Sequence, residues 1–125
     1  MTVLPLIMVV DDEERLRRLL SGAVEDQDDM RAVSAASAEE ALEILRGEPA
    51  DVAVVDLRLP GMDGESFIVQ AHREGLCRRF VMHSGSIDLT LTSAMQAAGM
   101  GPEDVLLKPV GVDVVHTRVR ELLKP

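Results

Sequence analysis

The sequence predicts an α/β fold in which a parallel sheet carries helices on both of its faces. Short, continuous apolar runs alternate with longer segments whose apolar residues recur at helical spacing. Continuous apolar runs are typical of parallel strands that are buried on both sides. The alternation continues along the chain without a linker, an internal repeat or a low-complexity tract. We therefore expect a single domain over residues 1–125.

Five segments are expected to form the strands of this sheet. Four of them are strongly apolar, whereas the second is a weaker candidate whose side chains alternate between its two faces. Each segment is followed by one with helical periodicity, which implies parallel strands joined by helices. In chain order, the expected strands cover residues 6–10, 30–36, 52–55, 79–84 and 105–107.

Local signals indicate where the helices begin and end. The first helix is expected to end at the acidic run 26–29, and Ser37 is the predicted N-cap of the second, because Glu40 follows at capping-box spacing. Gly64 opens the third helix, and Asp88 is expected to cap the fourth. The predicted apolar faces are Leu16, Leu19, Leu20, Ala23 and Val24 in the first helix, Leu91, Ala94, Met95 and Ala98 in the fourth, and Val112, Val115, Val119, Leu122 and Leu123 in the last.

The composition excludes several classes of partner and location. Asp and Glu total 22 against 13 Lys and Arg, so the net charge of -9 disfavours direct binding of nucleic acid. No segment approaches the roughly 18 apolar residues of a membrane span, and the N-terminus lacks a signal peptide. The single cysteine, Cys77, is expected to be structural and fits a cytoplasmic protein. The histidines lack ligand spacing and are expected to be structural or exposed: His72, His83 and His116.

Side chains suited to a phosphoryl group lie at the ends of four of the expected strands. Asp11 and Asp12 come after the first, Asp56 after the third and Lys108 after the fifth, and Ser84 is the last residue of the fourth. Ligands of such sheets bind beyond the carboxyl ends of the strands, so these side chains are expected to share one crevice. Asp12 and Asp56 can bind Mg²⁺, with Asp11 able to hold a metal-bound water. Without the cation, a raised pKa or proton sharing is expected among the three carboxylates.

Asp56 has a second predicted role, because a carboxylate can attack a phosphoryl donor and carry the group as an acyl phosphate. Lys108 would offset the charge of the transferring group, and Ser84 would donate a hydrogen bond to it. Each of these residues alone is explained as well by a helix cap, a surface lysine or a turn. Glu13 and Glu14 come next to the aspartate pair, and a solvated helix start explains them equally well.

Over essentially all 125 residues, the chain resembles the receiver domain of two-component response regulators. The most specific segment is Asp56-Leu57-Arg58-Leu59-Pro60-Gly61-Met62-Asp63-Gly64. It is similar to the receiver pattern of a phosphoacceptor Asp, two residues, an apolar residue, Pro, any residue, and Met-Asp-Gly. The resemblance implies a flavodoxin-like three-layer sandwich of five βα units, with a parallel sheet in the order 2-1-3-4-5.

The resemblance also implies a role for each site residue. Asp56 would be the phosphoacceptor, Ser84 the switch hydroxyl and Lys108 the phosphoryl-binding lysine, joined to Pro109 by a cis peptide bond. The metal ligands would be Asp11, Asp12, Asp56 and the backbone carbonyl of Arg58.

The implied function is signalling rather than enzyme catalysis, although a receiver takes part in its own phosphorylation and dephosphorylation. A histidine kinase or histidine phosphotransfer protein would donate the phosphoryl group in a Mg²⁺-dependent reaction, and the phosphorylated domain would bind a downstream protein. No direct contact with nucleic acid or membrane is expected. The protein is expected to be a monomer or a weak dimer.

Departures from the receiver pattern concern the transmission of the signal. Val105 stands where many receivers carry Tyr or Phe, Val110 where Phe is frequent, and the stretch between Gly99 and Lys108 is longer than the common form. We therefore expect intact phosphate chemistry, with aliphatic repacking around Val105 in place of an aromatic switch.

Several alternatives stay open from the sequence. The chain could be a receiver fragment of a larger hybrid kinase or effector-bearing regulator, or a pseudo-receiver that binds partners without phosphorylation. A small Mg²⁺-dependent phosphatase is disfavoured, because Arg58 stands where those enzymes carry a second Asp. Arg58 also lies at the predicted mouth of the crevice. We hypothesise that it sets the lifetime of the phosphoryl group; a simple exposed loop arginine is the alternative.

Overall fold

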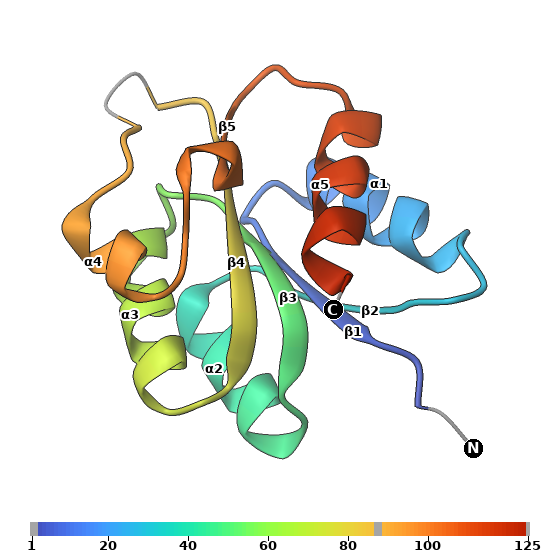
Figure 1. Cartoon of the computed structure of the whole chain (residues 1–125), viewed down its shortest axis with the longest axis horizontal. Helices are drawn as coiled ribbons and strands as arrows, with labels where there is room; N and C mark the ends of the chain where they lie inside the picture. The colour runs from blue at the N-terminus through green and yellow to red at the C-terminus, as the bar shows by residue number, and fades with distance from the viewer. Residues whose placement is uncertain (1–2, 87–88, 125) are drawn as a thin grey trace.

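In the computed structural model, which describes residues 3–86 and 89–124, strands and helices alternate along the chain (Figure 1). The strands are β1 (Leu6–Val10), β2 (Arg31–Ala35), β3 (Ala50–Val55), β4 (Cys77–Ser84) and β5 (Val105–Leu107). The helices are α1 (Glu14–Glu25), α2 (Ala38–Gly47), α3 (Gly64–Arg73), α4 (Ser93–Ala97) and α5 (Val112–Leu123), with a 3₁₀ turn, η1, at Pro102–Asp104. Within the described ranges, none of these helices has the length and apolar character of a membrane span.

The strands form one parallel sheet in the order β2-β1-β3-β4-β5. The predicted α/β class and the order implied by the resemblance are both confirmed. The chain moves from β1 outward to β2 and then returns to β3 on the other side of β1. The strand order therefore reverses between β1 and β3, which is the place where open α/β sheets bind ligands.

The sheet separates two apolar cores (Figure 1). Helices α2, α3 and α4 cover one face, and α1 and α5 cover the other. Successive side chains of a strand alternate between the cores, so Met8 packs in the first and its neighbours Ile7 and Val9 in the second. Every residue of β1 is buried because both faces are covered, which explains its uninterrupted apolar sequence. Phe67 and Phe80 are both buried in the first core.

The predicted apolar face of α1 is wrong at one position. Leu20 and Val24 are buried and Leu16 packs against the same core, but Leu19 is 54% exposed. Consecutive residues of a helix point about 100° apart, so a helix lying on a sheet buries Leu20 and turns Leu19 toward solvent. The sequence pattern was compatible with a wider apolar stripe than the sheet covers.

The second helix begins as predicted, and the fourth does not. The Ser37 hydroxyl accepts the backbone N–H of Glu40 at 3.2 Å, which confirms the predicted N-cap of α2. Helix α4 begins only at Ser93, where Thr92 accepts the backbone N–H of Met95 at 3.2 Å. Asp88, the cap predicted from the sequence, lies outside the described residues. Because the helix is short, fewer of its residues face the core, and Ala94, predicted to be inward, is exposed.

A buried ion pair joins the segment before β5 to α5. Asp104 is 1% exposed, and its carboxylate accepts hydrogen bonds from Arg118 Nε at 2.7 Å and from the Gly101 N–H at 2.8 Å. A buried carboxylate needs such partners because it has lost its hydration. The long stretch between Gly99 and Lys108 is therefore folded around Asp104 and held against α5.

Cys77 is buried at the start of β4, as expected of a structural residue. Burial raises the pKa of its thiol to about 12, so the group stays protonated at neutral pH. The thiolate is the reactive form of cysteine, and Cys77 is accordingly not a nucleophile.

The orientation of α1 predicts different effects of two neighbouring substitutions. Leu20→Ala is expected to lower the free energy of unfolding by about 2–5 kcal/mol, because it leaves a cavity between α1 and the sheet. Leu19→Ala, at the exposed neighbour, is expected to change it by about 0.5 kcal/mol or less. Urea unfolding followed by circular dichroism measures both values. Similar losses in the two variants would contradict the orientation described here.

Candidate functional site

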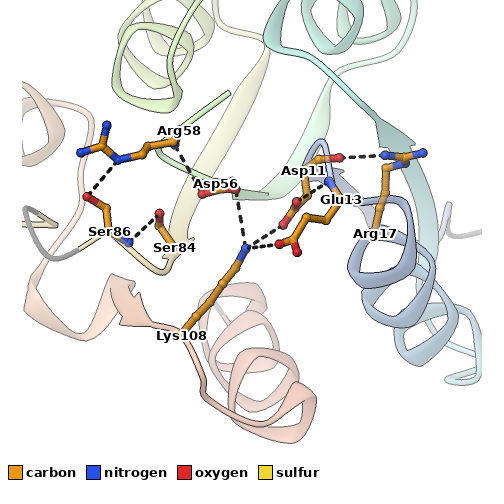
Figure 2. A network of polar contacts seen from close by, with 8 residues as sticks. All are labelled: Asp11, Glu13, Arg17, Asp56, Arg58, Ser84, Ser86 and Lys108. Atoms are coloured by element: carbon orange, nitrogen blue, oxygen red, sulfur yellow. Dashed lines mark hydrogen bonds and ion pairs between the residues drawn. The ribbon is translucent and has the colours of Figure 1, made fainter. Parts of the chain in front are cut away.

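Backbone hydrogen bonds continue the sheet beyond the strand ends and bring the predicted site residues together. The Asp56 N–H donates to the Val10 carbonyl at 3.0 Å, and the Lys108 N–H donates to the Ser84 carbonyl at 2.8 Å. Residues that directly follow neighbouring parallel strands therefore lie side by side at one edge of the sheet (Figure 2). The predicted convergence of Asp11, Asp12 and Asp56 beside the amine of Lys108 is confirmed.

The ammonium group of Lys108 lies among three carboxylates. Its Nζ is 3.2 Å from Glu13 Oε2, 3.3 Å from Asp11 Oδ2 and 3.6 Å from Asp56 Oδ2. Burial lowers the pKa of Lys108, but the charges of Asp11 and Asp56, together with the hydrogen bonds to Glu13 and Asp11, outweigh this effect and leave the pKa above its ordinary value. Lys108 is therefore fully charged at neutral pH. Its peptide bond to Pro109 is cis, as the resemblance implied.

Asp11 is buried and organises the loop between β1 and α1. Its Oδ1 accepts the Glu13 N–H at 2.9 Å, and its backbone carbonyl accepts a hydrogen bond from Arg17 Nη1 at 2.8 Å. Burial raises the pKa of Asp11; the Glu13 N–H and the charge of Lys108 oppose this increase, and the charge of Asp56 adds to it. The predicted pKa elevation among the carboxylates is confirmed at Asp11, with burial rather than repulsion as the main cause.

Asp11, Asp12 and Asp56 form the acidic cluster predicted from the sequence. One carboxylate oxygen of each residue lies within 4.8 Å of the others. Asp11 and Asp56 are buried and Asp12 is exposed, so the cluster opens to solvent on one side. Clustered carboxylates that leave room for water are the donors Mg²⁺ prefers, and the residues present fit this ion.

Ser84, Ser86 and Arg58 lie together on one side of Asp56 (Figure 2). Ser84 is buried, and its Oγ accepts the Ser86 N–H at 3.4 Å, which leaves the hydroxyl hydrogen for another acceptor. The Arg58 N–H donates to Asp56 Oδ1 at 3.4 Å, and Arg58 Nε donates to Ser86 Oγ at 3.3 Å. The arginine therefore links the loop that follows Asp56 to the loop that follows Ser84.

The loop from β3 to α3 passes unusually close to Asp56. The Gly64 N–H donates to the Leu57 carbonyl at 2.8 Å, and a Cβ at Gly64 would lie 2.2 Å from the backbone oxygen of Asp56. Only glycine permits this approach of two backbone segments. Asp63 begins α3 directly beside it by accepting the Ser66 N–H at 2.8 Å.

The structure distinguishes two glutamates that the sequence left equivalent. Both side chains are 64% exposed, but Glu13 contacts Lys108, whereas Glu14 pairs with Arg18 at 3.0 Å. The sequence carried no local signal that separates them, and their difference appears only in the structure. Glu13 is the N-cap of α1, a position that favours Ser, Thr, Asp or Asn, and its side chain makes no capping bond.

His83 lies beneath the site and was not assigned a role from the sequence. It is buried, and neither ring nitrogen has a hydrogen-bond partner among the described residues. Burial lowers the pKa of His83, and the charge of Lys108 lowers it further, so the ring is neutral at neutral pH. Together with Leu16, Leu19 and Val110, it lines a hollow of about 320 Å³. Its burial is one of the two outcomes expected for the histidines.

Comparison with known proteins identifies the family. The sequence model described as the response regulator receiver domain matches residues 7–120, which is most of the chain. The chain belongs to the response regulator receiver domain family. Receiver domains are signalling domains of two-component systems, and this agrees with the phosphoacceptor chemistry indicated by the acidic cluster and Lys108.

Two curated relatives of this receiver are transcriptional regulators. It is 26% identical over 121 residues to transcriptional regulatory protein AfsQ1 of Streptomyces coelicolor, covering 97% of this chain and 52% of that protein. It is 30% identical over 118 residues to the KDP operon transcriptional regulatory protein KdpE of Escherichia coli, covering 94% of this chain and 51% of that protein. The receiver thus spans about half the length of these two relatives.

Solved structures share the fold of this receiver. The chemotaxis response regulator CheY4 of Vibrio cholerae has a TM-score of 0.81 at 20% identity, with coverage of 97% of this chain and 100% of that one. A receiver domain protein described as CheY-like from Methanospirillum hungatei has a TM-score of 0.82 at 24% identity, with coverage of 95% of this chain and 93% of that one. At these identities the similarity shows the fold alone.

The close approach at Gly64 predicts a destabilising effect of one methyl group. Gly64→Ala is expected to lower the free energy of unfolding by about 1–3 kcal/mol, because the added Cβ forces the loop away from Asp56. Gly22→Ala is the control: Gly22 lies within α1 with no atom in the way of a Cβ, and alanine there is expected to stabilise by about 0.5–1 kcal/mol. Urea unfolding of both variants measures the difference. Equal stability of Gly64→Ala and the wild type would contradict the packing at this loop.

Proposed function

We propose that this receiver accepts a phosphoryl group on Asp56 in a Mg²⁺-dependent reaction and signals through altered binding of a partner protein. The position of Lys108 Nζ, 3.6 Å from Asp56 Oδ2 beside the acidic cluster, is the observation that carries the proposal. A carboxylate oxygen of Asp56 would form a bond to phosphorus while the bond from phosphorus to the donor breaks. The product is an acyl phosphate on Asp56, and the electron pair of the broken bond stays with the donor.

The metal would be held by the acidic cluster. Asp11, Asp12 and Asp56 supply carboxylates to this site, and the backbone carbonyl of Arg58 is proposed as a further ligand. When bound, Mg²⁺ would offset the negative charge of the carboxylates and of the phosphoryl group. The buried position of Asp11 and Asp56 favours this interpretation, since the two carboxylates share the single positive charge of Lys108 and a divalent cation would stabilise them further.

Lys108 and Ser84 would stabilise the phosphoryl group on Asp56. The charged ammonium of Lys108 is close enough to reach a phosphoryl oxygen with a small movement of its side chain. The Ser84 hydroxyl has a hydrogen to donate, because its oxygen already accepts the Ser86 N–H. Such fixed donors lower the energy of charge that develops during phosphoryl transfer.

For the partners, we propose a histidine kinase or histidine phosphotransfer protein as donor and a separate downstream protein as target, in the cytoplasm. The family supports this assignment, as does the acidic composition, which disfavours nucleic acid as a direct target. Val105 is only partly buried, whereas Phe67 and Phe80 are fully buried in the first core. We therefore propose that activation moves aliphatic side chains around Val105 and leaves both phenylalanines in place.

The phosphoacceptor assignment is tested with a small phosphodonor. With acetyl phosphate and Mg²⁺, the wild-type protein is expected to gain the mass of one phosphoryl group, and Asp56→Asn is expected to gain none because it lacks the nucleophile. Removal of Mg²⁺ with EDTA is expected to prevent the adduct. Mass spectrometry of the intact protein measures all three results.

The control for this experiment is Asp51→Asn, at the other end of β3. Asp51 accepts the Leu6 N–H at 2.9 Å, and an asparagine oxygen can accept it too. This variant is expected to form the adduct normally. A folded wild-type protein that forms no adduct would contradict the proposed function and favour a pseudo-receiver.

The hypothesis for Arg58 concerns the lifetime of the phosphoryl group. Its side chain is tied to Ser86 near Asp56, so Arg58→Ala is expected to admit water and to speed dephosphorylation several-fold. Loss of the adduct after removal of acetyl phosphate, followed by mass spectrometry, gives the rate. Arg18→Ala, which breaks only an exposed pair with Glu14, is expected to leave the rate unchanged. The hypothesis is wrong if Arg58→Ala and the wild type dephosphorylate equally fast.

A further inference from the structure

Glu13 makes the shortest of the three ion-pair contacts of Lys108. Its Oε2 is 3.2 Å from the lysine Nζ, compared with 3.3 Å for Asp11 and 3.6 Å for Asp56. None of the roles implied by the receiver pattern falls on Glu13. The ammonium group is therefore closer to a carboxylate outside the metal cluster than to the proposed phosphoacceptor.

The local structure directs the Glu13 side chain toward Lys108. Its backbone is fixed, because the Glu13 N–H donates to Asp11 Oδ1 at 2.9 Å. As the N-cap of α1, it makes no side-chain capping bond, so its carboxylate is not used to satisfy the helix. Figure 2 shows the carboxylate reaching the lysine from the α1 side, whereas the contact with Asp56 leaves the amine in a different direction.

The exposure of the two side chains makes this contact reversible. The Glu13 side chain is 64% exposed and that of Lys108 is 18% exposed. Glu13 is hydrated on its outer side, so it can lose the lysine without leaving a buried, unpaired charge. Asp11, with a side chain only 3% exposed, cannot lose it so easily. Among these two carboxylates, Glu13 is the one that Lys108 can leave at low cost.

We propose that Glu13 is a positioning residue that holds Lys108 back from Asp56 in the unphosphorylated receiver and so weakens the binding of a phosphoryl group. The inference rests on the proposed function of Asp56 and Lys108. A phosphoryl group on Asp56 attracts the ammonium of Lys108 toward the phosphoryl oxygens. As that contact forms, the contact between Lys108 and Glu13 weakens. The free energy of the Glu13–Lys108 pair therefore opposes phosphorylation.

The test is the affinity for beryllofluoride, a phosphoryl analogue, measured by calorimetric titration at saturating Mg²⁺. Glu13→Gln is expected to bind it about two- to fivefold more tightly than the wild type, the effect expected for a partly exposed ion pair. Saturating Mg²⁺ separates this effect from any loss of metal affinity. An increase in the affinity for beryllofluoride supports the proposal, because damage to the fold would weaken binding.

Glu14→Gln is the matched control. It removes the same charge from the next residue, but Glu14 contacts Arg18 at the surface and not Lys108. Its affinity for beryllofluoride is expected to equal that of the wild type, whereas an effect of overall charge would appear in both variants. Glu13→Ala is a second variant that removes the carboxylate without adding an amide, and it is expected to bind more tightly as well. Thermal unfolding checks that all variants are folded.

The outcomes separate this inference from the proposed function. Normal binding by the wild type, with equal or weaker binding by both Glu13 variants, would overturn the role of Glu13 alone. A tighter complex of Glu14→Gln, equal to that of Glu13→Gln, would also overturn it. If the folded wild-type protein does not bind beryllofluoride, the proposed function fails and the inference falls with it.

Discussion

The balance of charge around Lys108 is the constraint on which the site depends. Its amine faces two buried carboxylates, Asp11 and Asp56. Burial has removed their hydration, so a nearby cation has to compensate for the lost stabilisation of their charges. The amine is held in place by β5, a strand of three residues that pairs with β4 and is extended by the bond from Lys108 to Ser84. The short outermost strand of the sheet thus fixes a cation that stabilises the buried carboxylates of the acidic cluster.

The main features of the fold and site were predictable from the sequence because they follow from burial. A run such as Leu6–Val10 has few places in a folded chain other than the middle of a covered sheet. Polar residues that directly follow such runs must lie at the edge of the sheet, so Asp56 and Lys108 could be placed together before any coordinates. The order of the strands was different: it came from the resemblance to receivers, since the apolar pattern does not specify which strands are neighbours.

The features that were missed depend on contacts between elements. The pattern of α1 allowed Leu19 and Leu20 to face the core, and only packing against the sheet decides the rotation of the helix. Glu13 and Glu14 are chemically identical, and the position of Lys108, far away in the sequence, decides which of them enters the site. The late beginning of α4 also involves such a contact, because Thr92, which caps the helix, donates its hydroxyl to Glu65 of α3.

The buried pair of Asp104 and Arg118 has a consequence for the evolution of this receiver. If Arg118 changes alone, Asp104 keeps a buried charge without its cation, and such a loss costs about 3–5 kcal/mol. If Asp104 changes alone, Arg118 is partly exposed and still pairs with Glu103 and Glu121 at 3.8 Å, so the cost is smaller. Replacement of both by apolar residues of similar volume is far less costly. A change at position 118 should therefore accompany or follow a change at position 104 among descendants that keep this connection, whereas the exposed Glu14 and Arg18 are free to change independently.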